Sequence, residues 1–362
     1  MVNKISLRFP IELIITLIIT LIICRESLLQ TFYSSTVFNS GILTLVILLI
    51  NFTNFSKKVK LLLPLLTFMI LSVLLNSVYI EKGGYITFGL STLSFMLLFI
   101  NIKRIDIRKL YNYISFIVFL FLFIIYYFYL MGLQVIPSHI FYVLAGPFQN
   151  QNQTGMILLC LSAIITSLQR STKLNHIMLF LLTVSIILTQ SRAAMLGVFI
   201  ILTFYYRKKL ILLTPILIIL SIQVIRLYAD VFERLIHKIT TGGSSYRVEF
   251  WTEALNNMQN NILTFFFGNG VNVTTVELYG ESLSLHSSYV NFIVAYGWLA
   301  TVFLILLIFY ILYEAKKNDN LIFVSLLSLL AHGFFETSLF LGFSICWMSF
   351  ILMFSLRKLI NT

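Results

Sequence analysis

The stretch Tyr111–Met131 reads YNYISFIVFLFLFIIYYFYLM and decides the class of fold. It carries no charged side chain, and it has the roughly 20 apolar residues that an α-helix needs to cross the hydrocarbon core of a bilayer. Comparable runs recur at Leu61–Tyr79 and Ser287–Leu312. These runs are continuous, whereas the strands of a membrane barrel alternate apolar and polar residues. The sequence therefore predicts an all-α, polytopic integral membrane protein.

The composition of the whole chain agrees with this class. Of 362 residues, 59% are hydrophobic and 10% are charged, whereas about a quarter of a soluble domain is charged. Lipid must therefore surround most of the chain. We predict about twelve transmembrane helices, at residues 9–25, 35–53, 61–79, 84–101, 110–131, 152–169, 174–190, 192–206, 209–228, 287–313, 320–337 and 341–356.

The basic residues indicate how these helices are oriented. With the predicted spans, 18 of the 25 Lys and Arg residues fall on one side, which is cytoplasmic by the positive-inside rule. We therefore expect a multi-pass protein of the cytoplasmic membrane with both termini in the cytoplasm. The net charge of +12 is a topology signal and an attraction to anionic lipid, and it does not indicate a nucleic-acid partner.

One predicted extracytoplasmic loop, at residues 229–286, is much longer than the other connections, and long loops in compact proteins are commonly functional. We divide the chain into transmembrane helices 1–9 in residues 1–228, this loop, and helices 10–12 in residues 287–362. The loop contains a helical apolar pattern made by Arg247, Trp251, Ala254, Leu255 and Met258. We expect a short amphipathic helix there, lying on the outer membrane surface.

Two arginines lie on the predicted outer side, where basic residues are disfavoured. Arg192 follows a turn between two spans, and either anion binding in an outer cleft or snorkelling at the interface explains it. Arg247 lies in the first turn of its helix, where the helix dipole disfavours a cation, so an anion is expected nearby. The alternative for Arg247 is pairing with Glu249 or Glu253, or stacking on Trp251.

Three further ionisable residues lie near the predicted outer boundary. His286 ends the long loop just before the tenth span, and a histidine there suits either general-base work near neutral pH or a merely interfacial position. His332 and Glu336 are four residues apart on one predicted helix face. That spacing suits a hydrogen bond that stabilises the bundle, or a role in orienting a substrate hydroxyl.

Several kinds of site have no sequence signal. There is no phosphate-cradling glycine loop, no paired-histidine zinc spacing and no carboxylate cluster suited to a divalent cation. We therefore predict neither a metal nor a cofactor. The candidate site lies at the outer lipid boundary and contains two arginines and a histidine, which suits an amphiphilic substrate with a pyrophosphate at headgroup level.

Three motifs occur in order along the chain. They are Gly146–Asn152 (GPFQNQN) with Gly155, then Ser191–Gly197 (SRAAMLG), then Arg247 and Trp251 with Phe267–Gly270 (FGNG) and His286–Gly297. In this order the chain resembles the superfamily of O-antigen ligases and of O-antigen or capsular polysaccharide polymerases. One departure is Ala193, where many relatives have glycine, and it leaves the arginine charge in place.

The resemblance implies a GT-C-like glycosyltransferase fold and a metal-independent enzyme. It implies that Arg192 and Arg247 hold the lipid diphosphate and that His286 activates the acceptor hydroxyl. Supporting residues of this site would be Asn152, Trp251, His332 and Glu336. These roles agree with the chemistry, because paired arginines stabilise a diphosphate leaving group and a base accepts the hydroxyl proton.

We expect a polymerase that joins undecaprenyl-diphosphate-linked oligosaccharide repeat units into capsular polysaccharide, exopolysaccharide or O-antigen on the outer face of the membrane. A chain-length regulator and a flippase of the same pathway are the expected protein partners. One alternative is an O-antigen ligase-type transferase, which shares these motifs and differs in its acceptor. An alternative of a different class is a flippase or transporter of the lipid-linked oligosaccharide, since twelve spans with inside termini also fit transporters.

Overall fold

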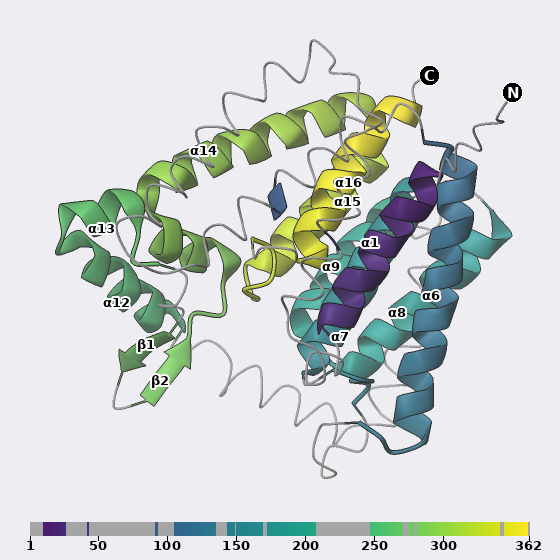
Figure 1. The fold of residues 1–362 in the computed structure, drawn as a ribbon, viewed down its shortest axis with the longest axis horizontal. Helices are drawn as coiled ribbons and strands as arrows, with labels where there is room; N and C mark the ends of the chain where they lie inside the picture. The colour runs from purple at the N-terminus through teal and green to yellow at the C-terminus, as the bar shows by residue number, and fades with distance from the viewer. Residues whose placement is uncertain are drawn as a thin grey trace, which may run out of the picture.

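The computed structural model describes residues 10–26, 42, 91–92, 105–134, 143–148, 150–168, 172–207, 247–270, 275–278, 281–340 and 344–360. Figure 1 shows their helices and one hairpin, with the labels used below. The helices are α1 (Ile11–Glu26), α6 (Ile107–Leu130), α7 (Gln151–Leu168), α8 (Lys173–Thr189), α9 (Arg192–Tyr205), α12 (Arg247–Gln259), α13 (Ile262–Phe267), α14 (Ser288–Asn318), α15 (Asn320–Gly333) and α16 (Ile345–Ile360). The strands are β1 (Thr275–Leu278) and β2 (Glu281–Ser284), which pair antiparallel.

The helical class predicted from the sequence is confirmed, and the hairpin is a departure from it. Strands β1 and β2 lie inside the predicted loop 229–286, with Thr275 opposite Ser284. Two residues, Tyr279 and Gly280, separate the strands in the sequence, which is a spacing typical of hairpins. The prediction of a purely helical protein overlooked this signal.

The predicted spans that fall within the described residues are helices, with boundaries shifted by a few residues. The largest difference is in the tenth span, predicted to end at residue 313, whereas α14 continues to Asn318. The eleventh span, predicted to end at residue 337, ends at Gly333 in α15. The chain turns there, because the amides of Phe334 and Phe335 donate to carbonyls three residues earlier. The predicted spans at 35–53, 61–79, 84–101 and 209–228 lie outside the described residues.

Among the described residues, two helices are long and apolar enough to cross a membrane. These are α6, with a mean hydropathy of 2.3 over its most apolar window, and α14, with 2.5. Helices α8, α9, α15 and α16 are apolar but shorter. Large apolar side chains also point outward from several helices, including Phe123 at 68% exposed and Phe309 at 66%. An apolar outer surface of this kind is what lipid contacts, so the chain is a membrane protein.

Helix α7 forms the centre of the bundle. Every side chain from Thr154 to Leu168 is buried, and the helix contacts α6, α8, α9, α15 and α16. A helix that is buried all round needs apolar residues on every face, and the sequence of α7 provides them. Two cysteines that lie in separate apolar runs meet in this core, because the sulfurs of Cys160 and Cys346 are 3.4 Å apart.

The helix ends gather on two faces of the bundle. On one face α7, α9 and α14 begin and α15 ends, as shown by the hydrogen bond from Ser288 Oγ to the Glu336 carbonyl at 2.5 Å. We call this end of the molecule the site face. On the opposite face α6 and α8 begin and α9 ends, linked by contacts such as His176 Nδ1 to the Tyr206 hydroxyl at 2.8 Å.

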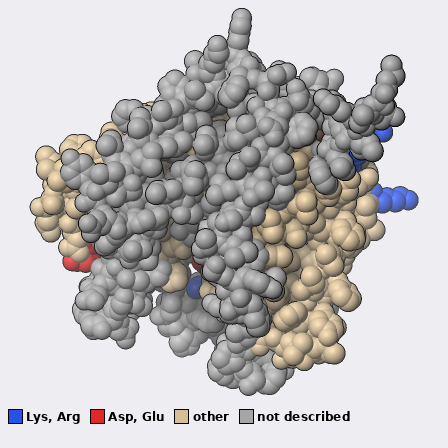
Figure 2. All heavy atoms as spheres, in the orientation of Figure 1, with Lys and Arg blue, Asp and Glu red and all other residues tan. Residues whose placement is uncertain are grey.

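The opposite face carries exposed basic residues. Its exposed cations in the described residues are Arg108, Lys109, Lys173, Arg207, Lys316 and Lys317. In Figure 2, Lys and Arg side chains project at the upper right, where Figure 1 shows the beginning of α6. This gathering agrees with the asymmetry of charge on which the predicted orientation depends. That the basic face is cytoplasmic stays a prediction.

The predicted amphipathic helix exists, but its apolar face does not lie on the membrane surface. Helix α12 packs Ala254 and Met258 against Leu285 and Val290, so protein covers this face. The following helix, α13, instead exposes its apolar side chains, with Ile262 at 71% exposed and Leu263 at 54%. The prediction was wrong because helical periodicity identifies an apolar face but not what covers it. In Figure 1, α12, α13 and the hairpin lie together beside the start of α14.

Candidate functional site

His286 is held in a backbone conformation that is rare for a residue other than glycine. Its φ is 44°, in the left-handed region, which costs about 1–3 kcal/mol for a residue with a side chain. The imidazole is exposed, whereas the neighbours Leu285 and Ser287 are each 1% exposed. The chain is therefore anchored on both sides of His286, and the imidazole is presented on the site face directly before α14.

Trp251 provides one of these anchors. Its indole Nε1 donates a hydrogen bond of 2.6 Å to the carbonyl of Leu285, the residue before His286. The Trp251 ring also packs against the buried cluster of Ala254, Met258 and Leu285. A tryptophan 34 residues away in the sequence thus fixes the backbone that presents the histidine. The sequence placed Trp251 near the site, and the structure gives it a positioning contact.

Arg192 lies at the uncapped start of a helix. It is the first residue of α9, its side chain is exposed, and the N-cap residue Ser191 makes no side-chain capping hydrogen bond. The Ser191 hydroxyl is buried and has no hydrogen-bond partner among the described residues. The first amides of α9 are therefore left without a side-chain cap. Free amides, the positive end of the helix dipole and a guanidinium together favour an anion at this point.

The turns that carry Arg192 and His286 have the same local geometry. Gln190 and His286 are the two non-glycine residues with positive φ in the described part of the chain. Each is followed by a serine N-cap, Ser191 or Ser287, without a side-chain capping bond, and then by a helix. Both turns thus lead into helices whose first amides lack a side-chain cap. The serine pair was visible in the sequence, but the left-handed conformation before it was not.

The first motif lies beside the turn of Arg192. Gly155 in α7 faces α9, and a Cβ on it would lie 2.7 Å from the Ser191 Cβ, which is too close for any other residue. Asn152 is in the first turn of α7, where its backbone amide donates to Asn150 Oδ1 at 2.8 Å. The structure therefore brings the start of α7, with Asn152, next to the start of α9.

Two glycines of the third motif interlock α13 with a kink in α14. Gly297 has φ 77° and ψ 174°, and the helix bends there. The kink frees two carbonyls, and the loop after α13 satisfies them, with Asn269 N bonding Val294 O at 2.7 Å and Gly270 N bonding Ala295 O at 3.1 Å. A Cβ on either Gly268 or Gly297 would approach the other segment's backbone closer than 3.0 Å. These glycines therefore have a structural role, which is to hold the loop against α14.

The predicted pairing of His332 with Glu336 on one helix face is wrong. Because α15 ends at Gly333, Glu336 lies in the following turn. There its carbonyl accepts the Ser288 hydroxyl. His332 is fully buried, and neither ring nitrogen has acceptable hydrogen-bond geometry with a described residue. Glu336 is thus tied to the start of α14 by its backbone, and His332 lies in the core.

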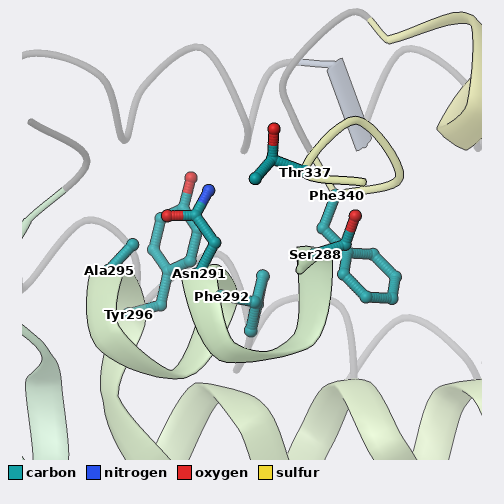
Figure 3. A pocket seen from close by; sticks show the side chains of 7 residues that line it. All are labelled: Ser288, Asn291, Phe292, Ala295, Tyr296, Thr337 and Phe340. Carbon is teal, nitrogen blue, oxygen red and sulfur yellow. The ribbon is translucent and has the colours of Figure 1, made fainter. Parts of the chain in front are cut away.

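A pocket that the sequence argument missed opens beside the first turns of α14. It is small, with a cavity volume of about 10 Å³, room for about one water molecule, and is lined by Ser288, Asn291, Phe292, Ala295, Tyr296, Thr337 and Phe340. Figure 3 shows these side chains, which come from α14 and from the turn after α15. The available signal was Asn291 itself, because a polar amide within an apolar span is costly unless it has a function.

The structure connects the predicted site residues in part. Helix α15 contacts both α9, which carries Arg192, and α14, which follows His286. Arg247 is the first residue of α12, and its side chain lies outside the described residues. Within the described part of the chain, no three His, Cys, Asp or Glu residues are grouped so that they could hold a metal ion.

Residues 177–305 match a family model described as O-antigen ligase. The match confirms the resemblance that the motifs indicate, and it supports a membrane-bound enzyme that processes glycans. It includes Arg192, Arg247, His286 and Gly297, whereas the Gly146–Asn152 motif precedes it. The comparison with curated proteins yields no match.

Proposed function

We propose that this chain, whose residues 177–305 match the O-antigen ligase family, is a polymerase of lipid-linked glycans. Its substrates are oligosaccharide repeat units carried on undecaprenyl diphosphate, and it acts on the outer face of the cytoplasmic membrane. The observation that carries the proposal is the exposed His286, which is held in a strained left-handed conformation directly before the start of α14. Strain of this kind persists only where the surroundings enforce it, and it clusters at active sites.

The reaction forms one bond and breaks another. The acceptor hydroxyl gives its proton to His286, and its oxygen attacks the anomeric carbon of the donor sugar. The bond between that carbon and the diphosphate oxygen breaks, and the electron pair leaves with undecaprenyl diphosphate. A neutral imidazole suits the first step, because its unprotonated ring nitrogen can accept the proton.

The leaving diphosphate needs compensation of its growing charge. Arg192, next to the uncapped amides of α9, offers charge-assisted hydrogen bonds of the kind that bind phosphate groups. Arg247 begins α12 and is proposed as the second diphosphate ligand on the strength of the motif. Preorganised donors aimed at a developing charge commonly supply the largest part of catalysis, so this arrangement would serve without a metal.

A ligase is the second candidate, because the matching family model is itself described as O-antigen ligase. The chemistry at the donor is the same in both enzymes, and the acceptor differs. A polymerase transfers the glycan to another lipid-linked repeat unit, whereas a ligase transfers it to a different acceptor such as a lipid core.

The test is glycan transfer in liposomes that contain the purified protein and lipid-linked repeat units alone. A polymerase lengthens the glycan under these conditions. The His286→Ala variant should lower turnover by about 10²- to 10⁴-fold while the lipid-linked substrate still binds, because a general base contributes about that much.

The His286→Phe variant is the matched control. It keeps an aromatic side chain that can lie at the headgroup level but removes the base. Full activity of this variant would refute the catalytic role of His286. No chain growth with repeat units alone, but transfer after a lipid core is added, would favour the ligase. Scrambling of the lipid without transfer would instead indicate a transporter.

A further inference from the structure

We propose that α13 is a membrane anchor, and that its apolar face contacts lipid acyl chains in the leaflet on the site face. On the exposed side of this helix, Ile262 is 71% exposed, Leu263 54% and Phe266 44%. In Figure 2 the left edge of the molecule is formed by uncharged residues, where Figure 1 shows α13. This surface takes no part in the proposed glycan transfer, so lipid contact there is independent of that reaction.

The exposed face of α13 continues a stripe of apolar side chains on α14. Beyond the kink, α14 exposes five large apolar side chains at the spacing of one helix face. They are Val302, Ile305, Leu306, Phe309 and Tyr313. Helix α14 is long and apolar enough to cross a membrane, so lipid covers this stripe. Trp298 lies one turn before the stripe, and its ring is 6.3 Å from the ring of Phe265 in α13, measured between centroids. The two apolar faces therefore adjoin and share the same surroundings.

Distance along α14 places α13 at the edge of the hydrocarbon core. At the other end of α14, Lys316 and Lys317 are exposed charges, which lie outside the core. The segment from Trp298 to Lys316 rises about 27 Å at 1.5 Å per residue, and the core is about 30 Å thick. A tilt of α14 shortens the distance measured across the membrane. Trp298 thus lies at the far boundary of the core, where tryptophan is enriched, and α13 packs against it at that depth.

The composition around α13 suits this depth. Residues 254–276 carry no charged side chain, and a charge beside lipid is costly. Exposed amide side chains precede the helix instead, at Asn256, Asn257, Gln259 and Asn260. Amides can bond water and lipid headgroups, whereas the exposed side chains of α13 cannot. The chain therefore changes from polar to apolar as it enters α13, as expected for a segment that passes from the headgroups to the acyl chains.

Helix α13 also pairs backbone groups that lipid could not satisfy. The side chain of Asn261 accepts a hydrogen bond from the Leu263 amide at 2.9 Å, and its carbonyl accepts one from the Phe265 amide at 2.9 Å. At the other end, the Gly268 amide donates to the Thr264 carbonyl at 2.8 Å. A segment in contact with lipid must satisfy its backbone polar groups within the protein. These bonds therefore allow so short a helix to lie there.

The experiment measures the depth of the fluorophore NBD, attached to single cysteines of the protein in phosphatidylcholine vesicles. Leu263→Cys places the label on the exposed face of α13, and Ile262→Cys is used in parallel. Cys24→Ala is the common background, because the other two cysteines, Cys160 and Cys346, are buried. The quenchers are a lipid with a nitroxide near the headgroup end of its acyl chain, and aqueous iodide. We expect the nitroxide lipid to quench the labels on α13 strongly and iodide to quench them little.

Asn257→Cys is the matched control, because Asn257 is exposed in the last turn of α12, before the chain becomes apolar. Iodide should quench this label, whereas the nitroxide lipid should quench a label at Val302→Cys on the stripe of α14. Equal iodide quenching at Leu263 and Asn257 would show that water covers α13 and would overturn the proposal. Protection of the Leu263 label from both quenchers would overturn it too, because protein, such as a second copy of the chain, would then cover α13. Equal nitroxide quenching at Leu263 and Asn257 would show that the apolar face of α13 does not set the boundary.

Discussion

Replacing Gly297 by alanine tests whether the kink in α14 holds the segment Phe266–Gly270 against this helix. The φ of 77° and ψ of 174° at Gly297 are open to glycine almost alone. An added Cβ would also lie 2.5 Å from the Phe267 nitrogen, with the Phe266 carbonyl oxygen closer still. Both contacts are with backbone, so no side-chain rotation can relieve them. The segment Phe266–Gly270 must therefore move away from α14.

The magnitude follows from what this movement breaks. An alanine in that conformation costs about 1–3 kcal/mol. The hydrogen bonds from Asn269 and Gly270 to the freed carbonyls of α14 are lost, and each contributes about 0.5–1.5 kcal/mol net. We expect the free energy of unfolding to fall by about 2–6 kcal/mol. Transfer activity should fall with it, because α12 and α13 are displaced together and Trp251 then loses Leu285.

The assay is thermal unfolding in detergent, followed by tryptophan fluorescence. Trp251 bonds the residue before His286, and Trp298 lies 6.3 Å from Phe265 between ring centroids, so two of the three tryptophans report on this interface. Gly132→Ala is the matched control, because Gly132 also has positive φ, at 66°, but a Cβ there meets nothing within 4 Å. In Gly132→Ala, the free energy of unfolding should fall only by the cost of placing alanine in a left-handed conformation, about 1–2 kcal/mol.

Two results bear directly on the reasoning. If Gly297→Ala destabilises the protein no more than Gly132→Ala does, the close approach of α13 to α14 is not what holds the loop. The double variant Gly268→Ala with Gly297→Ala should be destabilised by less than the sum of the single variants, because each breaks the same contact. Additive effects would show that the two glycines act independently.

Three further single substitutions test the residues around the reaction. Arg192→Ala and Arg247→Ala should each abolish polymer formation while the abundance of the protein stays normal. Lysine at either position should restore polymer formation only in part, because it lacks the planar fork of arginine. Normal amounts of polymer in cells that carry Arg192→Ala would exclude the anion site. Trp251→Phe keeps the aromatic ring but removes the donor to the Leu285 carbonyl, so we expect turnover to fall while the melting temperature changes little. In the His286→Ala background, Trp251→Phe should cause no further loss of turnover. Unchanged turnover in Trp251→Phe, measured by chain growth in liposomes, would show that this bond does not position His286.

Much of the architecture could be predicted from the sequence, because it depends on local composition. A continuous apolar run such as Tyr111–Met131 must form a helix in lipid, and α6 has nearly the predicted boundaries. The helical pattern in the long loop likewise predicted α12. The charges that stand on the predicted outer side drew attention to Arg192 and His286, since a charge is costly near lipid wherever the chain folds.

The conformation of the candidate site could not be predicted, because it depends on contacts between residues far apart in the sequence. The Trp251 bond spans 34 residues, and the Ser288 bond that shapes the pocket spans 48. The positive φ of His286 results from anchors on both sides of it, and the motif glycines are needed because two backbones meet. The periodicity of the sequence identified the apolar face of α12 correctly, but we expected lipid to cover this face, whereas other parts of the protein cover it. Local composition determined which segments are helices, and only packing decided which helix covers α12, how His286 is presented and that Asn291 lines a pocket.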